Sequence, residues 1–394
     1  MRVEPTLGAI FRAFGGEYLK RRGATERQRA VMRHIATCRT PALGGHKYAC
    51  DSCDHRSVIT WNSCRDRHCP LCQGRESAKW VDAMRQRILP THYFHVVFTV
   101  PHELNFLMLL NKKRCYDILF KASAETLKKV LGDPKRLGAK PAFTSVLHTW
   151  TQDLQFHAHV HAIVSGGGLS LDKKSWVASR PNFLAPVKVL SRVFRGKFLE
   201  LLSHAQADCD DPLVLRSDVA CLADRDEFDR FKSRLRLKDW VVYVKEPLRG
   251  PLAVCKYFAG YTHRVGISNK RIVAVTDGRV RFLARHRAKD GTYLGMRELS
   301  LDADRFISRF LLHVLPRGYT RIRHYGITAP GNIKTQIPLA CALIKEANAL
   351  AKPDGEDDRD TQPPTDPSVC PKCGGRMLLL QTFDPVRRDP FDTS

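Results

Sequence analysis

Two cysteine pairs near the N-terminus have the spacing of metal ligands. Cys50 and Cys53 form one C-x2-C pair and Cys69 and Cys72 form another, with fifteen residues between them. Each pair can place two thiolates on one ion, and a second pair at this separation completes a tetrahedral zinc site. We therefore predict one structural zinc ion bound by these four cysteines. The metal would supply much of the folding energy of so small a unit.

Further cysteines and a histidine raise the question of a second metal ion. Cys38, Cys64 and His68 lie beside the first cluster and are candidate ligands for a second zinc site, or they bind no metal. Cys370 and Cys373, near the C-terminus, form half a site. Such a pair needs further ligands from this chain or another subunit before it can hold zinc.

Three histidines alternate along residues 156–164, which read FHAHVHAIV. The alternation places His157, His159 and His161 on one face of a strand. Neighbouring histidines lie roughly 6.6 Å apart along the strand and can bind one ion together, whereas the outer two are roughly 13 Å apart. The apolar residues that follow indicate burial, and three buried histidines would be costly without a polar partner. The pattern predicts a metal site.

Two tyrosines, Tyr257 and Tyr261, lie four residues apart in a predicted helix over residues 251–264. This spacing places both on one helix face, where tyrosines most often serve only for packing. Beside a histidine metal site in a basic protein, the two tyrosines are better candidates for a catalytic role. A phenol suits phosphodiester cleavage because a covalent phosphotyrosine conserves the energy of the broken bond for rejoining.

The charge of the chain points to a polyanionic partner. The 394 residues include 65 Lys and Arg against 40 Asp and Glu, a formal net charge of +25. Nucleic acid is the expected partner, although ribosomal or membrane-surface binding would give the same charge. No segment approaches the roughly 18 apolar residues of a membrane span. We expect a cytoplasmic protein whose cysteines stay reduced.

The pattern of elements predicts an α+β protein in three parts. Residues 1–90 form the zinc-binding part, residues 91–335 alternate strand and helix signals, and residues 336–394 hold a helix, a flexible linker and the last cysteine pair. Within the middle part, residues 107–130 read as one helix. Asp277-Gly278 between two apolar runs is a strong hairpin signal.

Several segments of the chain resemble one family of mobile-element proteins. His159-Val160-His161 matches the His-hydrophobic-His motif of the HUH endonuclease superfamily. The surrounding segments resemble, in order, the bacterial rolling-circle transposases of the insertion-sequence family numbered ninety-one. They read NSCRDRHCPLCQ from Asn62, HVVFTVPHEL from His95, LHTWTQDLQFHAHVHAIVSGGGLS from Leu147, KYFAGYTHRVGISN from Lys256 and RIRHYGI from Arg321.

The resemblance implies an HUH core, which is a central antiparallel sheet flanked by helices. A small zinc-binding domain would precede this core in the sequence. It implies Mg²⁺ or Mn²⁺ held by His159, His161 and a third ligand. His148 is preferred, because related conjugative relaxases carry a histidine eleven residues before the pair; His157 and His95 are the alternatives. Tyr257 and Tyr261 would attack DNA in turn, leaving 5′-phosphotyrosine links and free 3′-OH groups.

The expected substrate is single-stranded DNA at element ends and targets in the bacterial nucleoid, with a host helicase or replication machinery as a further partner. We expect the DNA contacts to come from basic residues, namely Arg65, Arg67, Arg192, Arg195, Lys197 and Arg264. Phe258 and Gly260 depart from the family pattern of the tyrosine motif. The alternatives are a plasmid relaxase or replication initiator with the same chemistry, a zinc hydrolase, and a decayed zinc-containing DNA-binding regulator.

Overall fold

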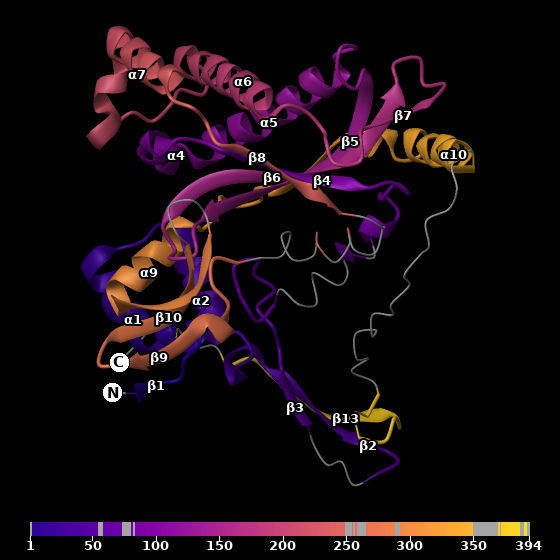
Figure 1. The fold of residues 1–394 in the computed structure, drawn as a ribbon. Helices are drawn as coiled ribbons and strands as arrows, with labels where there is room; N and C mark the ends of the chain where they lie inside the picture. Colours follow the sequence, from indigo (N-terminus) through magenta and orange to yellow (C-terminus); the bar gives the residue numbers. More distant parts are fainter. Residues whose placement is uncertain are drawn as a thin grey trace.

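Three antiparallel β-sheets organise the protein. The computed structural model describes residues 2–53, 58–72, 80–81, 83–248, 254, 257, 265–287, 292–349, 369–370, 372–386 and 390–391. The strand orders are β12-β5-β6-β4-β8 with β7 beside β6, β1-β9-β10-β11, and β13-β2-β3. Helices flank the first two sheets, which confirms the predicted α+β class (Figure 1). Among the described residues, no helix is long and apolar enough to cross a membrane.

The largest sheet carries a layer of helices on one face. Its strands are β4 (Tyr93–Thr99), β5 (Ala139–Trp150), β6 (Phe156–Ser170), β7 (Trp176–Ala178), β8 (Val242–Leu248) and β12 (Ile322–Gly326). The helices on that side are α4 (Asn105–Leu110), α5 (Lys112–Gly132), α6 (Val187–Ala207) and α7 (Arg225–Leu237) (Figure 1). Val160 of β6 belongs to the core that this layer buries. Because side chains alternate along a strand, His159 and His161 point to the opposite face.

The predicted helix over residues 107–130 is interrupted. Asn111 lies between α4 and α5 with φ −119° and ψ 44°, outside the helical region. Its side-chain oxygen accepts a hydrogen bond from the backbone N–H of Val214, 2.7 Å away, while its amide donates to Leu107 O. A long-range contact therefore divides a segment whose periodicity is continuous.

The second sheet shares a core with the N-terminal helices. The unit contains β1 (Arg2–Val3), α1 (Leu7–Arg22), α2 (Glu26–Thr37), β9 (Ile272–Thr276), β10 (Arg279–Arg287), β11 (Tyr293–Asp302) and α9 (Ala303–Leu312). β1 pairs with β9, and Phe11 of α1 packs against Phe310 of α9. The N-terminal helices therefore pack in one core with strands and a helix that were predicted to belong to the middle part, residues 91–335.

The predicted hairpin at Asp277-Gly278 is confirmed. β9 and β10 pair antiparallel, with Thr276 opposite Arg279. Asp277 and Gly278 both have positive φ, 50° and 72°, as a two-residue turn of this kind requires.

The third sheet joins the two ends of the chain. β2 (Gly45–Cys50) and β3 (Val58–Trp61) form a hairpin, and β13 (Met377–Phe383) pairs with the outer edge of β2. In the sequence, α10 (Gln336–Ala349) lies between β12 and β13, and it packs beside β7. Figure 1 shows β2, β3 and β13 set apart from the other two sheets.

Candidate active site and metal centres

The hairpin of β5 and β6 gathers three histidines. His148 lies directly opposite His159 in the strand register, and Val146 lies opposite His161. One ring nitrogen from each of His148, His159 and His161 lies within 4.8 Å of the others. The structure therefore brings the preferred third ligand to the predicted pair, whereas His157 and His95 lie outside this group.

Buried surroundings keep the imidazole of His159 neutral. Burial lowers the pKa of His159 to about 4, with the nearby His157 as a further cause. The N–H of His159 at Nδ1 donates to the backbone oxygen of His157 at 2.8 Å, which leaves Nε2 to face a metal. Neutral imidazole is the form that binds metal ions. The three histidines consequently fit a divalent transition-metal ion.

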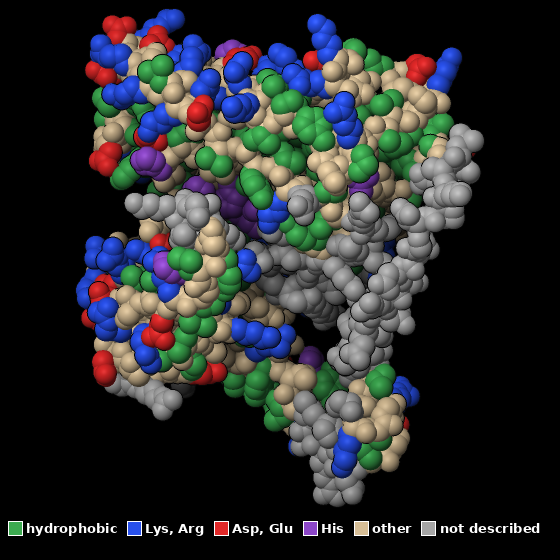
Figure 2. All heavy atoms as spheres, in the orientation of Figure 1, with side chains coloured by type: hydrophobic (Ala, Val, Ile, Leu, Met, Phe, Trp, Pro, Cys, Tyr) green, Lys and Arg blue, Asp and Glu red, His purple; other side chains and the backbone are tan. Residues whose placement is uncertain are grey.

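A hydrogen-bonded path links Tyr257 to this cluster. Its hydroxyl lies 2.8 Å from Nδ1 of His95, and Nε2 of His95 lies 2.8 Å from Nδ1 of His161. His95 is a β4 residue, and β4 pairs with β6 in the sheet. Burial, and secondarily the charge of Lys245, lowers the pKa of His95 to about 3. Figure 2 shows histidine side chains in a hollow beneath the part of the molecule that carries the helix layer.

From the sequence, His95 is predicted only as an alternative metal ligand. Nothing local distinguishes its role, because its contacts come from β6 and from the segment containing Tyr257. Tyr261 and Arg264 lie outside the described residues.

The basic residues predicted to contact DNA lie in different places. Arg195 of α6 donates to Lys238 O at 2.6 Å, and Lys197 forms an ion pair with Glu200 at 3.2 Å. With Arg192 they belong to the helix layer, on the sheet face opposite the histidines. Lys245 is instead exposed on β8, directly opposite His95 in the strand register. No sequence pattern indicates Lys245, because strand pairing alone brings it to the site.

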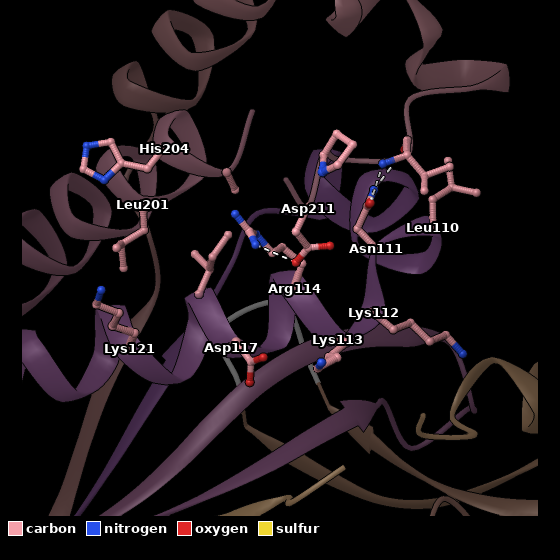
Figure 3. Close-up of a pocket in the computed structure, with 14 residues that line it drawn as sticks. Leu110, Asn111, Lys112, Lys113, Arg114, Asp117, Lys121, Leu201, His204 and Asp211 are labelled. Carbon is pink, nitrogen blue, oxygen red and sulfur yellow. Dashed lines mark hydrogen bonds and ion pairs between the residues drawn. The ribbon is translucent and has the colours of Figure 1, made fainter. Parts of the chain in front are cut away.

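A pocket also opens within the helix layer. Figure 3 shows it between α5 and α6, lined by residues that include Lys113, Lys121 and His204. Arg114 in its wall pairs with Asp211 at 2.6 Å and with Asp208. These opposite charges satisfy one another, and the histidine cluster lies on the other side of the sheet.

The cysteines form two tetrads, which corrects the predicted zinc ligands. Cys69 and Cys72 meet Cys38 and Cys64, with all four sulfur atoms within 4.8 Å of one another. The Sγ of Cys72 lies 3.5 Å from that of Cys38 and 3.6 Å from that of Cys64. The prediction that the two N-terminal pairs share one ion was wrong, because β2 carries Cys50 away from the end of α2.

His68, a candidate for a second site, has a different role. Its Nδ1–H donates to Asp66 at 2.7 Å, and its Nε2 accepts the backbone N–H of Leu315 at 3.2 Å. Both ring nitrogens are therefore engaged in tying the first tetrad to residues that follow α9. Arg67 likewise donates to Tyr319 O, and burial lowers its pKa.

The second tetrad consists of Cys50, Cys53, Cys370 and Cys373. The C-terminal pair, half a site in the sequence, is thus completed within the same chain. The signal that could have indicated this result is proximity in the sequence, since Cys38 and Cys64 lie close enough to Cys69 and Cys72 to complete one set of four, and Cys50 and Cys53 then remain for the C-terminal pair.

Two family models match this chain, one in its N-terminal part and one in its middle part. A family model described as a transposase zinc-binding domain matches residues 10–100, and one described as a putative transposase matches residues 142–336. The two cysteine tetrads fit the structural zinc that such a domain binds. Together, the fold, the cysteines and the matched domains define a transposase with a zinc-binding domain.

Two relatives identify the family. The chain is 43% identical over 406 residues to putative transposase y4qJ of Sinorhizobium fredii, with 100% of each chain covered. It is 24% identical over 353 residues to the transposase for insertion sequence element IS801 of Pseudomonas savastanoi pv. phaseolicola, covering 87% of this chain and 81% of that relative. The chain belongs to the IS91 family of transposases, as its motifs predict.

Proposed function

We propose that this transposase nicks and transfers single-stranded DNA at the ends of its insertion sequence through 5′-phosphotyrosine intermediates, in rolling-circle transposition. The observation that carries the proposal is the path from the Tyr257 hydroxyl through His95 to His161. It connects a suitable nucleophile to a cluster of three metal-binding side chains. A hydrolase that activates water would leave this tyrosine without a role.

His148, His159 and His161 would hold Mg²⁺ or Mn²⁺. Imidazole ligands favour the softer ion, so Mn²⁺ should bind more tightly than Mg²⁺. When bound, the ion would polarise the scissile phosphate and offset the negative charge of the transition state.

The proton positions along the path follow from this assignment. With Nδ1 of His161 engaged by His95, Nε2 is the atom that would face the metal, so Nδ1 carries the proton and donates to Nε2 of His95. A neutral His95 then keeps its own proton on Nδ1, and this N–H donates a hydrogen bond to the Tyr257 oxygen. His95 would therefore stabilise the phenolate form of Tyr257, which is the reactive nucleophile.

In the proposed step, the Tyr257 oxygen attacks phosphorus and the bond from phosphorus to the 3′-oxygen breaks. The DNA keeps a free 3′-OH and the 5′-phosphate becomes linked to Tyr257. The proton that the phenol loses is balanced by the proton that the 3′-oxygen gains. Tyr261 would attack in a second, equivalent step.

The test is a covalent adduct assay on single-stranded oligonucleotides from the element ends, with Mn²⁺, on a denaturing gel. We expect a metal-dependent adduct that the double variant Tyr257→Phe/Tyr261→Phe abolishes. Tyr293→Phe is the matched control, because Tyr293 is exposed on β11. Metal-independent binding without an adduct would instead identify a decayed DNA-binding protein, and an adduct that survives in the double variant would exclude these nucleophiles.

A further inference from the structure

The second cysteine tetrad joins residues from opposite ends of the chain. Sγ of Cys50 lies 3.5 Å from Sγ of Cys373, 323 residues later, and Sγ of Cys53 lies 3.8 Å from Sγ of Cys370. All four sulfur atoms lie within 4.8 Å of one another. The matched zinc-binding domain ends at residue 100 and so includes only half of this set.

We propose that this tetrad is a second zinc site, which clasps the C-terminal segment onto the N-terminal β2–β3 hairpin and makes it part of the zinc-binding module. The proposal is independent of the tyrosine chemistry. It commits to two zinc ions per chain, one in each tetrad.

The sulfur geometry suits zinc rather than disulfide bonds. Zn–S bonds of about 2.3 Å in a tetrahedron place neighbouring sulfur atoms roughly 3.8 Å apart, close to the two distances observed. A disulfide needs about 2.05 Å, so these contacts are not covalent. Four converging thiols with no carboxylate or imidazole among them select zinc over harder divalent ions.

Backbone groups are already arranged for thiolates. The N–H of Ser52 points to Sγ of Cys50, that of Lys372 to Cys370 and that of Gly375 to Cys373, each at 3.4 Å. Such amide donors stabilise negative charge on sulfur. A Cβ at Gly375 would lie 2.7 Å from Oγ of Ser52, so the two cysteine loops approach as closely as a glycine allows.

The contacts beyond the tetrad show what the clasp would hold. Met377 pairs with Cys50 and Phe383 with Gly45 along β13 and β2, and the ring of Phe383 lies 5.5 Å from that of Trp61. Further along, Phe391 packs so closely on α1 that a Cβ at Gly15 would lie 2.7 Å from its ring. Holding the C-terminal segment here therefore completes a sheet and covers an N-terminal helix.

Zinc content of the purified full-length protein is the first test. All samples carry His159→Ala, so that the histidine cluster does not add to the zinc count. We expect two zinc ions per chain when the cysteines are intact and one in Cys370→Ser/Cys373→Ser. The matched control is Cys209→Ser/Cys221→Ser, which removes two exposed cysteines outside both tetrads and should keep two ions. A single ion with intact cysteines, or two in the tetrad variant, would overturn the proposal.

The second test measures the clasp itself. A site-specific protease sequence is inserted between residues 355 and 356, and the cleaved protein is run on a sizing column. The C-terminal fragment should stay with the body when zinc is bound and separate from it after chelation. A fragment that remains bound after complete zinc removal would show that strand pairing suffices and would refute the clasp. This chelation test keeps every cysteine, so its result does not depend on whether a cysteine variant folds.

Discussion

The hydroxyl of Tyr257 lies 2.8 Å from Nδ1 of His95, although 162 residues separate them in the sequence. His95 in turn contacts His161 of the histidine cluster at 2.8 Å. This relationship places a buried imidazole between the proposed nucleophile and the proposed metal site, and it makes His95 a positioning residue whose contribution can be measured.

Replacing His95 should slow DNA cleavage more than it weakens metal binding. We expect His95→Phe to lower the rate of adduct formation by about 10- to 100-fold, the usual effect of losing an outer-shell partner. His95→Gln keeps a donor and should recover part of the rate. Single-turnover adduct kinetics and Mn²⁺ titration separate the two effects. Equal rates for wild type and His95→Phe would remove His95 from the mechanism.

The third metal ligand can be identified by comparing two histidines. His148→Ala should weaken Mn²⁺ binding by at least about 100-fold, beyond the range of outer-shell substitutions. His157→Ala is the matched control, since His157 lies two residues from His159 outside the cluster and should leave Mn²⁺ affinity nearly unchanged. Calorimetric Mn²⁺ titration measures both, and the reverse ranking would reassign the ligand.

The first cysteine tetrad should control the stability of the N-terminal unit. Cys69 is fully buried and belongs to the same core as Leu7 and Phe306. Because metal binding is coupled to folding in such sites, Cys69→Ser should lose one zinc ion and melt at lower temperature. Cys221→Ser, at an exposed position, should match the wild type. An unchanged melting temperature despite zinc loss would show that the core folds without the metal.

Gly326 should be intolerant of a side chain. It has φ of 64°, and a Cβ there would lie 1.8 Å from the backbone oxygen of Pro141 on β5. We expect Gly326→Ala to lower the free energy of unfolding by about 1–3 kcal/mol or more, because backbone strain adds to the clash. Gly331→Ala, where a Cβ would meet no atom of the described residues within 4 Å apart from its chain neighbours, should have little effect. Urea denaturation of both variants provides the comparison.

Lys245 should contact the DNA backbone more directly than the basic residues of α6. It faces the histidine side of the sheet opposite His95, whereas Arg195 lies in the helix layer. Lys245→Ala should weaken single-strand binding and reduce the salt dependence, the slope of log affinity against log salt, by about 0.7. Arg195→Ala should change neither quantity. Fluorescence anisotropy at several salt concentrations would detect the opposite result.

Much of the local chemistry follows from the sequence alone. Alternation places His159 and His161 on one face of a strand, and Asp277-Gly278 specifies a hairpin, because both depend only on neighbouring residues. The C-x2-C spacing likewise sets which cysteines can share an ion as a pair. The family motifs add the expected roles of these residues.

Tertiary structure alone decides which of these local pieces meet. Spacing suggested that the two N-terminal cysteine pairs share an ion, yet each joins partners elsewhere, Cys69 with Cys38 and Cys50 with Cys373. His95 reaches Tyr257 only through strand register and the path of the intervening chain. Closing a long loop costs only slightly more entropy than closing a short one, so sequence separation places little limit on which ligands converge. The physical reason is that long-range pairing depends on packing the whole chain, which no local pattern encodes.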